Sequence, residues 1–201
     1  TNWRYADEAK VPRICFINKL DRIGASFEHS YKTILERLTK KAIRMQIPIG
    51  LEEKHEGVID LLAMKAFYFE GEMGNKVIEK DLSAEAGIPE NLKSEAEKYH
   101  HELIEKIVEQ DDAVMNEYLE GKIPDIDTLK KLLRKGVITN EIFPVYAGSA
   151  LKNKGVQLVL DGVVDYLPSP LDIPSVEGTD PNNNDEIIFR HAKDEEPFSA
   201  L

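Results

Sequence analysis

This sequence of 201 residues has one cysteine, no long apolar run and no excess of positive charge. The single cysteine, Cys15, excludes a disulfide framework and makes a reducing compartment the expected setting. No apolar run approaches the roughly 20 residues that a membrane-spanning helix needs. Lys and Arg number 26 against 37 Asp and Glu, and the resulting net charge of -11 opposes broad binding of the chain to nucleic-acid phosphates.

The composition that remains, with 42% hydrophobic and 31% charged residues, is that of a globular protein. It excludes a disordered or collagen-like chain and leaves room for one or two domains. The sequence starts at Thr1 without a signal or transit pattern, and residues 197–201 have the pattern of a strand cut short. We therefore expect a piece of a longer protein.

An apolar strand followed by an amphipathic helix occurs twice. The first pair is a strand predicted at 11–17 and a helix predicted over 26–42, with Ser26 as its N-cap. The second pair is a strand predicted at 142–147 and a helix over 156–167, which Pro168 stops. This alternation is typical of a doubly wound α/β sheet.

The residues between the two pairs have a different character. Strand-like pieces at 43–49, 57–62 and 66–70 are separated by glycines and predict an antiparallel sheet, which three apolar stripes at helical spacing follow. Residues 85–127 hold 13 acidic and 4 basic residues, so this stretch carries -9 of the whole charge. We expect an inserted α+β subdomain over 43–140.

A stretch rich in proline and asparagine separates this part from the last residues and is typical of an interdomain linker. Beyond it, residues 186–189 and 197–201 have the pattern of the first strands of a further domain. The predicted partition is a first α/β part over 1–42, the insert over 43–140, the returning strand and helix over 141–168, the linker over 169–185 and the start of a second domain over 186–201.

Asn18-Lys19-Leu20-Asp21 directly follows the first strand, so its side chains emerge at the carboxyl end of the sheet, where open α/β folds bind ligands. A carboxylate there can accept two parallel hydrogen bonds from N1–H and the amino group of guanine, a donor pair that adenine lacks. Asp21 would then select guanine, while Lys19 covers the base and Asn18 ties neighbouring loops together. Taken alone, the tetrapeptide favours an ordinary surface turn, because so short a motif often occurs by chance.

Gly148-Ser149-Ala150-Leu151-Lys152 occupies the equivalent place after the second strand. Its small residues let the backbone approach a ligand, so the Ala150 N–H can donate to guanine O6 and Leu151 can cover the base. The alternative is an ordinary loop in which Ser149 only caps a helix. Two such loops after parallel strands of one sheet favour the binding of a base.

These loops and their surroundings resemble the translational GTPases, and among them the elongation factor G family. Asn18-Lys19-Leu20-Asp21 matches the guanine-specificity motif of that family, and Ser149-Ala150-Leu151 matches its second base-contacting motif. The runs VPRICFINKLDRIGASF, GSALKNKGVQ, DGVVDYLPSP and DEEPFSAL extend the likeness over nearly the whole chain. The resemblance implies a partial P-loop-type GTPase sheet in three layers, an inserted α+β subdomain and the first strands of a β-barrel domain.

The resemblance also implies a function. The full-length protein would bind GTP or GDP and hydrolyse GTP on the ribosome to drive movement of tRNA and mRNA. The sequence contains no G-x-x-x-x-G-K-S/T phosphate loop, and Asp21-Arg22-Ile23-Gly24 has the form of a D-x-x-G switch but lies on the wrong side of the base motif. We therefore expect the phosphate, Mg²⁺ and water-positioning groups upstream of Thr1, and no GTP hydrolysis by this chain alone.

The partners implied are the factor-binding region of the large ribosomal subunit and its stalk protein, with tRNA and mRNA contacted indirectly and no membrane. A face of the insert bearing Glu95, Glu102, Glu105 and Glu109 would meet the stalk protein by charge, although a plain solvated helix surface fits equally. The implied setting is the bacterial cytoplasm or, alternatively, the mitochondrial matrix. The alternatives are a recycling or organellar paralogue and, from another class, a non-catalytic acidic interaction module.

No metal site and no nucleophile are expected. The five histidines have no partners at zinc-like spacing, which predicts surface positions for them, and Cys15 is predicted to be a small core residue.

Overall fold

The structure, a computed structural model, describes residues 2–82, 87–172, 175–180 and 183–197. The chain divides into two units, Thr1–Leu167 and Pro168–Leu201, which are described one at a time. Of the helices in the described ranges, none combines the length and the apolar character needed to cross a lipid bilayer.

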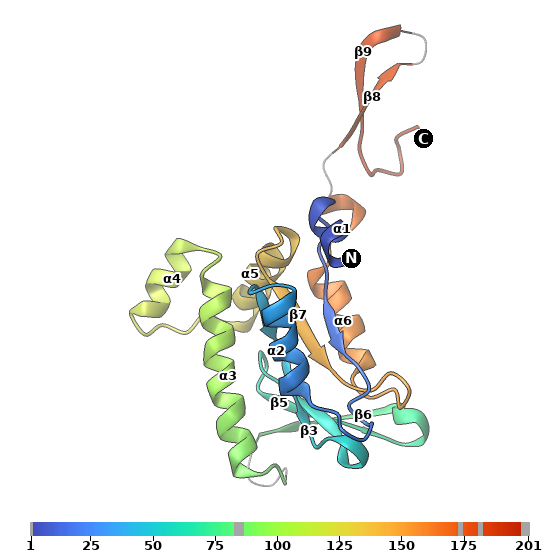
Figure 1. The fold of residues 1–201 in the computed structure, drawn as a ribbon. Helices are drawn as coiled ribbons and strands as arrows, with labels where there is room; N and C mark the ends of the chain where they lie inside the picture. The colour runs from blue at the N-terminus through green and yellow to red at the C-terminus, as the bar shows by residue number, and fades with distance from the viewer. Residues whose placement is uncertain (1, 83–86, 173–174, 181–182, 198–201) are drawn as a thin grey trace. The chain divides into compact units, whose positions relative to one another are not determined.

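A three-stranded parallel sheet lies at the centre of the first unit (Figure 1). Strands β1 (Cys15–Ile17) and β2 (Ala42–Arg44) both pair with β7 (Phe143–Ala147), in the order β1-β7-β2. All five residues of β7 are buried, as expected of a central parallel strand covered on both faces. Helix α2 (Phe27–Arg37) follows β1, and helix α6 (Val156–Tyr166) follows β7.

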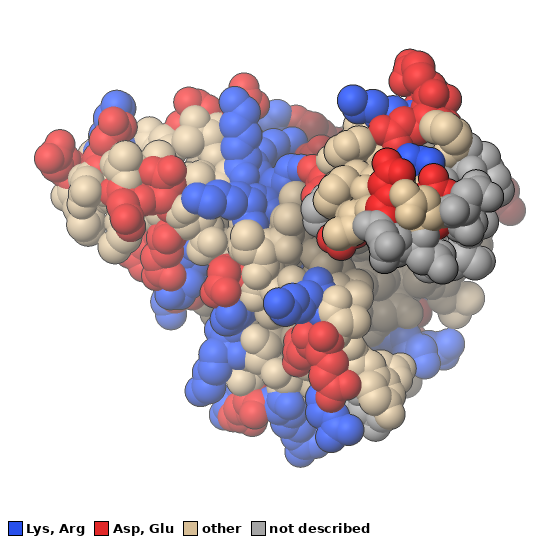
Figure 2. Space-filling view, turned by 90° about the horizontal axis from the view of Figure 1, so that it is seen from above, with Lys and Arg blue, Asp and Glu red and all other residues tan. Residues whose placement is uncertain are grey.

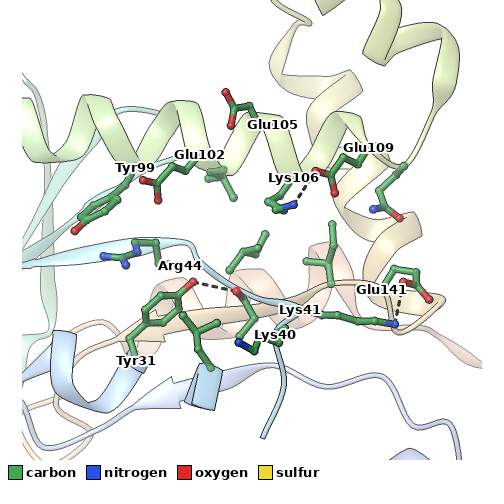
Figure 3. A pocket seen from close by; sticks show the side chains of 16 residues that line it. Tyr31, Lys40, Lys41, Arg44, Tyr99, Glu102, Glu105, Lys106, Glu109 and Glu141 are labelled. Carbon is green, nitrogen blue, oxygen red and sulfur yellow. Dashed lines mark hydrogen bonds and ion pairs between the residues drawn. The ribbon is translucent and has the colours of Figure 1, made fainter. Parts of the chain in front are cut away.

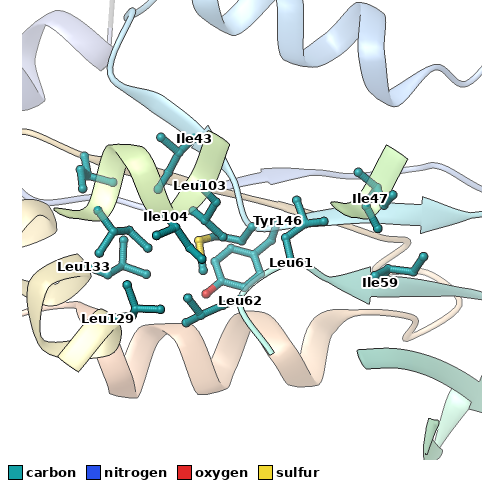
Figure 4. Packing of buried hydrophobic residues seen from close by; sticks show 14 of the residues in the cluster. Ile43, Ile47, Ile59, Leu61, Leu62, Leu103, Ile104, Leu129, Leu133 and Tyr146 are labelled. Carbon is teal, nitrogen blue, oxygen red and sulfur yellow. The ribbon is translucent and has the colours of Figure 1, made fainter. Parts of the chain in front are cut away.

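Alternate residues of β7 contribute to two hydrophobic cores. Val145 and Ala147 pack with Phe27 and Tyr31 of α2 on one face of the sheet. Tyr146 points to the other face and packs with leucines and isoleucines of the insert (Figure 4). Because helices cover both faces, the predicted three-layer α/β arrangement is confirmed.

The chain passes directly from the parallel sheet into a four-stranded antiparallel sheet. Its strands lie in the order of the sequence: β3 (Gln46–Ile49), β4 (Gly57–Asp60), β5 (Lys65–Glu70) and β6 (Lys76–Asp81).

The single strand predicted at 43–49 is therefore wrong, and so is the start of the insert at residue 43. Ile43 and Arg44 pair with β7, whereas β3 pairs with β4. Met45 joins the two sheets, because its N–H donates to Val145 O and its carbonyl accepts from Leu61 N, each at 2.9 Å. The continuous apolar pattern concealed this change of partner.

Helix α2 is shorter than predicted. Ser26 is its N-cap, as predicted, and accepts a hydrogen bond from the His29 N–H. The helix ends at Arg37, whereas the apolar stripe predicts helix as far as Ala42. Ala42 belongs to β2 instead, and its carbonyl accepts a hydrogen bond from the Tyr31 hydroxyl at 2.9 Å. Ala42 fits the spacing of the apolar stripe because β2 packs against α2, in the same core as Phe27 and Tyr31.

Three helices follow the antiparallel sheet, as predicted: α3 (Glu90–Val108), α4 (Asp112–Leu119) and α5 (Ile126–Ile138). Helices α3 and α5 each bury one face in the core. Helix α4 buries none of its residues and extends away from the sheets (Figure 1). Asp111 and Asp125 cap α4 and α5 by accepting hydrogen bonds from backbone N–H groups of the first turns.

Two elements of this unit have no signal in the sequence. Helix α1 (Asn2–Glu8) buries none of its residues; Arg13 holds it by lying over the Trp3 ring and pairing with Asp7 at 2.7 Å. Strand β6 is mostly exposed and lacks an apolar alternation. Its pairing with β5 defines it as a strand.

The second unit contains a short turn, η4 (Pro170–Asp172), and a hairpin of β8 (Val176–Asp180) and β9 (Asn183–Arg190). The predicted linker over 169–185 is wrong in its second half, because β8 and the start of β9 lie there. Pairing between β8 and β9 defines these residues as strands, although their sequence has no strand pattern. The strand predicted at 186–189 is confirmed within β9, and the one predicted at 197–201 lies outside the described residues apart from Pro197, which is not in a strand.

Gly162 in α6 lies against the central strand. A Cβ atom there would lie 2.3 Å from the Tyr146 hydroxyl oxygen and 2.7 Å from its ring. Alanine stabilises a helix relative to glycine by about 1 kcal/mol. We expect the steric clash of its methyl group with the buried Tyr146 side chain to cost more than this gain. We expect Gly162→Ala to lower the free energy of unfolding by about 1–2 kcal/mol net, measured by urea denaturation. The control Leu160→Ala changes an exposed residue of the same helix; equal effects would contradict this prediction.

Candidate functional site

The two predicted base loops lie side by side at the carboxyl ends of β1 and β7. The Gly148 N–H donates to Ile17 O and the Leu20 N–H donates to Gly148 O, each at 3.1 Å, so the pairing continues beyond the strands. Asn18 Oδ1 accepts from the Lys19 N–H at 2.7 Å and from the Ala150 N–H at 2.9 Å. Asn18 therefore ties the loops together, as the sequence predicts.

The second loop is a tight reversal that requires its first glycine. Ser149 and Lys154 exchange both backbone hydrogen bonds at 2.9 Å. A Cβ atom on Gly148 would lie 2.2 Å from Lys154 O and 3.1 Å from the Phe16 ring. The N-cap of α6 is Gly155, in a left-handed conformation with φ 84°, so Ser149 does not cap that helix. The alternative role for Ser149 as a helix cap is excluded.

Asp21 faces this loop with a carboxylate that is only partly satisfied. A hydrogen bond with the Ser149 side chain lowers the pKa of Asp21, which keeps the carboxylate ionised at neutral pH. Within the described part of the chain, Asp21 Oδ1 is buried and has no hydrogen-bond partner. A buried acceptor without a partner is unfavourable, so a ligand that donates to it would gain binding free energy.

Two other residues predicted for the site, Lys19 and Leu151, are exposed to solvent near this carboxylate. Lys19 is exposed and has a left-handed backbone, with φ 66°. Leu151 is 59% exposed, so its side chain is accessible to a ligand beside Asp21. The Ala150 N–H is engaged by Asn18, so the predicted bond to guanine O6 requires the exchange of one acceptor for another.

The family profile described as elongation factor Tu GTP binding domain matches residues 1–169. The chain belongs to this family. It is therefore a GTP-binding domain of the translation-factor type. A crystal structure of a protein from Thermus thermophilus is similar in fold, with a TM-score of 0.73 and 24% sequence identity over 86% of this chain. The chain spans about a quarter of the length of that protein, since the match covers 25% of it.

In this GTP-binding domain an open groove of about 750 Å³ lies beside Asp21. Both base loops line the groove, together with Glu52, Glu53 and His55 of the insert. No motif in the sequence points to this third wall, because the turn that forms it lies between β3 and β4 and reaches the base loops only in the folded chain.

His55 is buried in this turn, with 1% of its surface exposed, so its predicted surface position is wrong. Its Nδ1 lies 3.3 Å from Gly50 O, and its Nε2 is buried without a partner in the described ranges. Burial is the main cause that lowers the pKa of His55. His100 is also partly buried, and its Nδ1 lies 2.6 Å from Leu61 O.

Cys15 packs at the edge of the core that contains α2, and burial raises the pKa of its thiol. These properties are those of a core residue, as predicted. Among the described residues, no group of three His, Cys, Asp or Glu side chains is placed to hold a metal ion.

The predicted acidic surface of α3 borders a second groove, between α3 and β2. Glu102, Glu105 and Glu109 are among the residues that line this groove (Figure 3). Glu109 pairs with Lys106 at 2.7 Å and Glu102 with Lys98 at 3.8 Å. Figure 2 shows further acidic side chains on the lobe that contains α4, at the left of that view.

The burial of His55 predicts a pH dependence of stability. Because its pKa is lower in the folded than in the unfolded protein, the unfolded state binds more protons once the pH falls below about 6.5. Stability is therefore full above this pH and decreases as the pH falls toward the folded-state pKa. We expect His55→Asn, which keeps a donor for Gly50 O, to lose less stability than the wild type between about pH 7.5 and 5.5.

Thermal unfolding across that pH range measures the effect. His29→Asn, which removes an exposed histidine of α2, is the matched control for the loss of a histidine. Parallel stability curves for His55→Asn and the wild type would contradict the prediction.

Proposed function

We propose that this chain is the guanine-recognising part of the GTPase domain of a translation elongation factor G. The full-length factor would hydrolyse GTP on the ribosome to drive the movement of tRNA and mRNA. The observation that carries the proposal is the unpaired, buried Oδ1 of an ionised Asp21, which lies beside the second base loop in a member of a GTP-binding family.

The chemistry of Asp21 fits guanine better than any other common base. An ionised carboxylate accepts hydrogen bonds and donates none, and guanine presents N1–H and an amino group as adjacent donors. Adenine at the same place would leave the buried Oδ1 of this carboxylate unpaired, and such penalties give strong discrimination. Lys19 and Leu151, both exposed on either side, would cover the two faces of the base.

The phosphates and Mg²⁺ would be held by residues outside this chain. The sequence has no G-x-x-x-x-G-K-S/T loop, and phosphoryl transfer depends on that loop, on the metal ion and on a positioned water molecule. We therefore propose that the chain is part of a longer GTPase and does not hydrolyse GTP by itself. A recycling or organellar paralogue of the same family would use the same base site.

The partner that we propose for the insert is the ribosomal stalk protein, next to the factor-binding region of the large subunit. Glu95, Glu102, Glu105 and Glu109 recur on one side of α3, and acidic residues continue into α4. Such a field steers a basic partner and raises its association rate. The proposed setting is the bacterial cytoplasm, with the mitochondrial matrix as the alternative for an organellar form.

The role of Asp21 is tested in the full-length protein by Asp21→Asn. The amide places a donor where guanine also has a donor, while xanthine offers an acceptor there. We expect GDP affinity to fall on the order of a hundredfold or more, and xanthosine diphosphate to become the preferred ligand. Competition between the two diphosphates measures the change.

Glu53→Gln, which removes a carboxylate from the same groove, is the matched control and should leave the preference for guanine intact. An Asp21→Asn protein that still prefers GDP over xanthosine diphosphate would refute the proposed role of Asp21.

The acidic surface is tested by charge reversal at Glu102 and Glu105 together. We expect stimulation of GTP turnover by the stalk protein to fall about two- to tenfold, with most of the loss at low salt. The same reversal at Glu90 and Glu97, which lie about 60° to 140° around α3 from the tested pair by helical spacing, is the control. Equal stimulation in both variants would rule out a stalk contact through this surface.

A further inference from the structure

The turn of the insert between β3 and β4 holds the first base loop on both sides of Asp21. The Glu52 N–H donates to Leu20 O at 2.8 Å. The Glu52 carboxylate accepts a hydrogen bond from the Gly24 N–H at 2.7 Å. One residue of the insert therefore fixes the backbone before and after the carboxylate that faces the ligand groove.

This turn contains two residues with left-handed backbone, and one of them is not glycine. Glu52 has a left-handed backbone, with φ 57°, and Gly50 before it has φ 73°. A Cβ atom on Gly50 would lie 1.8 Å from Lys54 O, so only glycine fits there. Left-handed backbone at a residue other than glycine persists only where the surrounding structure holds it. Here the contacts with the base loop hold it.

The same turn also holds the second base loop. Lys154, at the end of the Ser149 reversal, donates from Nζ to His55 O at 2.5 Å. His55 is buried directly after Glu52–Lys54, so the anchor of this contact is rigid.

A second turn of the insert supports that loop from another direction. Gly74 lies so close to the loop that a Cβ atom on it would lie 2.8 Å from Lys152 O and 2.9 Å from Asn153 O. Gln157 of α6 donates from Nε2 to both Gly74 O and Asn153 O, each at 3.2 Å. Two turns of the antiparallel sheet thus reach the base loops at four places.

We propose that Glu52 is a positioning residue for guanine recognition and that the insert sheet sets the separation between Asp21 and the second base loop. The inference rests on the guanine recognition proposed above. Glu52 acts through the backbone of Leu20 and Gly24 and does not itself contact the base. Displacement of the turn would move Asp21 relative to Ser149. A structural change in the insert would therefore alter the hydrogen bonds between Asp21 and the base.

The variants separate the hydrogen bond from the mere presence of a side chain. Glu52→Gln keeps an oxygen that can accept from the Gly24 N–H, and Glu52→Ala removes it. Glu56→Ala is the matched control, because Glu56 is an exposed glutamate at the end of the same turn and does not line the groove beside Asp21.

The first measurement is GDP dissociation from the full-length protein, together with its preference for GDP over inosine diphosphate, which lacks the 2-amino group. We expect Glu52→Ala to release GDP about tenfold faster, the effect of losing one charge-assisted hydrogen bond at this loop. Its preference for GDP over inosine diphosphate should shrink, because a displaced Asp21 no longer reaches both donors. Glu52→Gln should stay near the wild type, and Glu56→Ala should match the wild type.

The second measurement is amide hydrogen exchange in the 201-residue chain without nucleotide. We expect the Gly24 amide to exchange faster in Glu52→Ala than in the wild type, and Glu52→Gln to restore most of its protection. Unchanged exchange at Gly24 would overturn the inference, and so would a Glu52→Ala protein that has lost thermal stability but kept its preference for GDP over inosine diphosphate.

If the proposed guanine recognition is wrong, these experiments give a different set of results. In that case Asp21→Asn would not alter base preference, while the Gly24 amide would still respond to Glu52→Ala. Guanine recognition intact at Asp21 with no response to Glu52→Ala would instead refute only the positioning role.

Discussion

The parallel pairing of β1 with β7 is the constraint from which the geometry of the base site follows. Its register places Ile17 opposite Ala147, so the residues that follow, Asn18 and Gly148, leave the sheet at the same level. Backbone hydrogen bonds beyond the strands, and the hydrogen bond from the Ala150 N–H to Asn18, then fix the positions of the two loops. Two loops far apart in the sequence form one site because the strands that precede them are hydrogen-bonded neighbours in one sheet.

The insert is continuous with this sheet. Met45 uses its N–H for the parallel sheet and its carbonyl for the antiparallel one, so the chain changes sheets with its backbone groups satisfied. The next residue, Gln46, is fully buried, and its Oε1 accepts from the Ala147 N–H at 3.2 Å. A bond from the insert thus reaches the last residue of β7, directly before the second base loop.

Charge and burial are distributed in different ways over the two parts of the first unit. Most of the acidity lies on α3, α4 and their connections, where the carboxylates are solvated or paired with nearby lysines. Around the base loops, a few polar groups are buried and only partly satisfied, such as Asp21 Oδ1 and His55 Nε2. The first pattern suits long-range attraction of a partner, whereas the second suits close recognition of a ligand.

Local periodicity and short motifs were enough to predict the strand and helix pairs, the helices of the insert and the position of Asn18-Lys19-Leu20-Asp21 after a buried strand, because neighbours in the chain encode these features. The folded chain alone reveals where Ala42 and Ile43 belong, that His55 is buried and that Glu52 holds the base loop. Strand partners and turn contacts depend on residues distant in the chain, and an apolar pattern does not say which sheet or which neighbour will satisfy a backbone group.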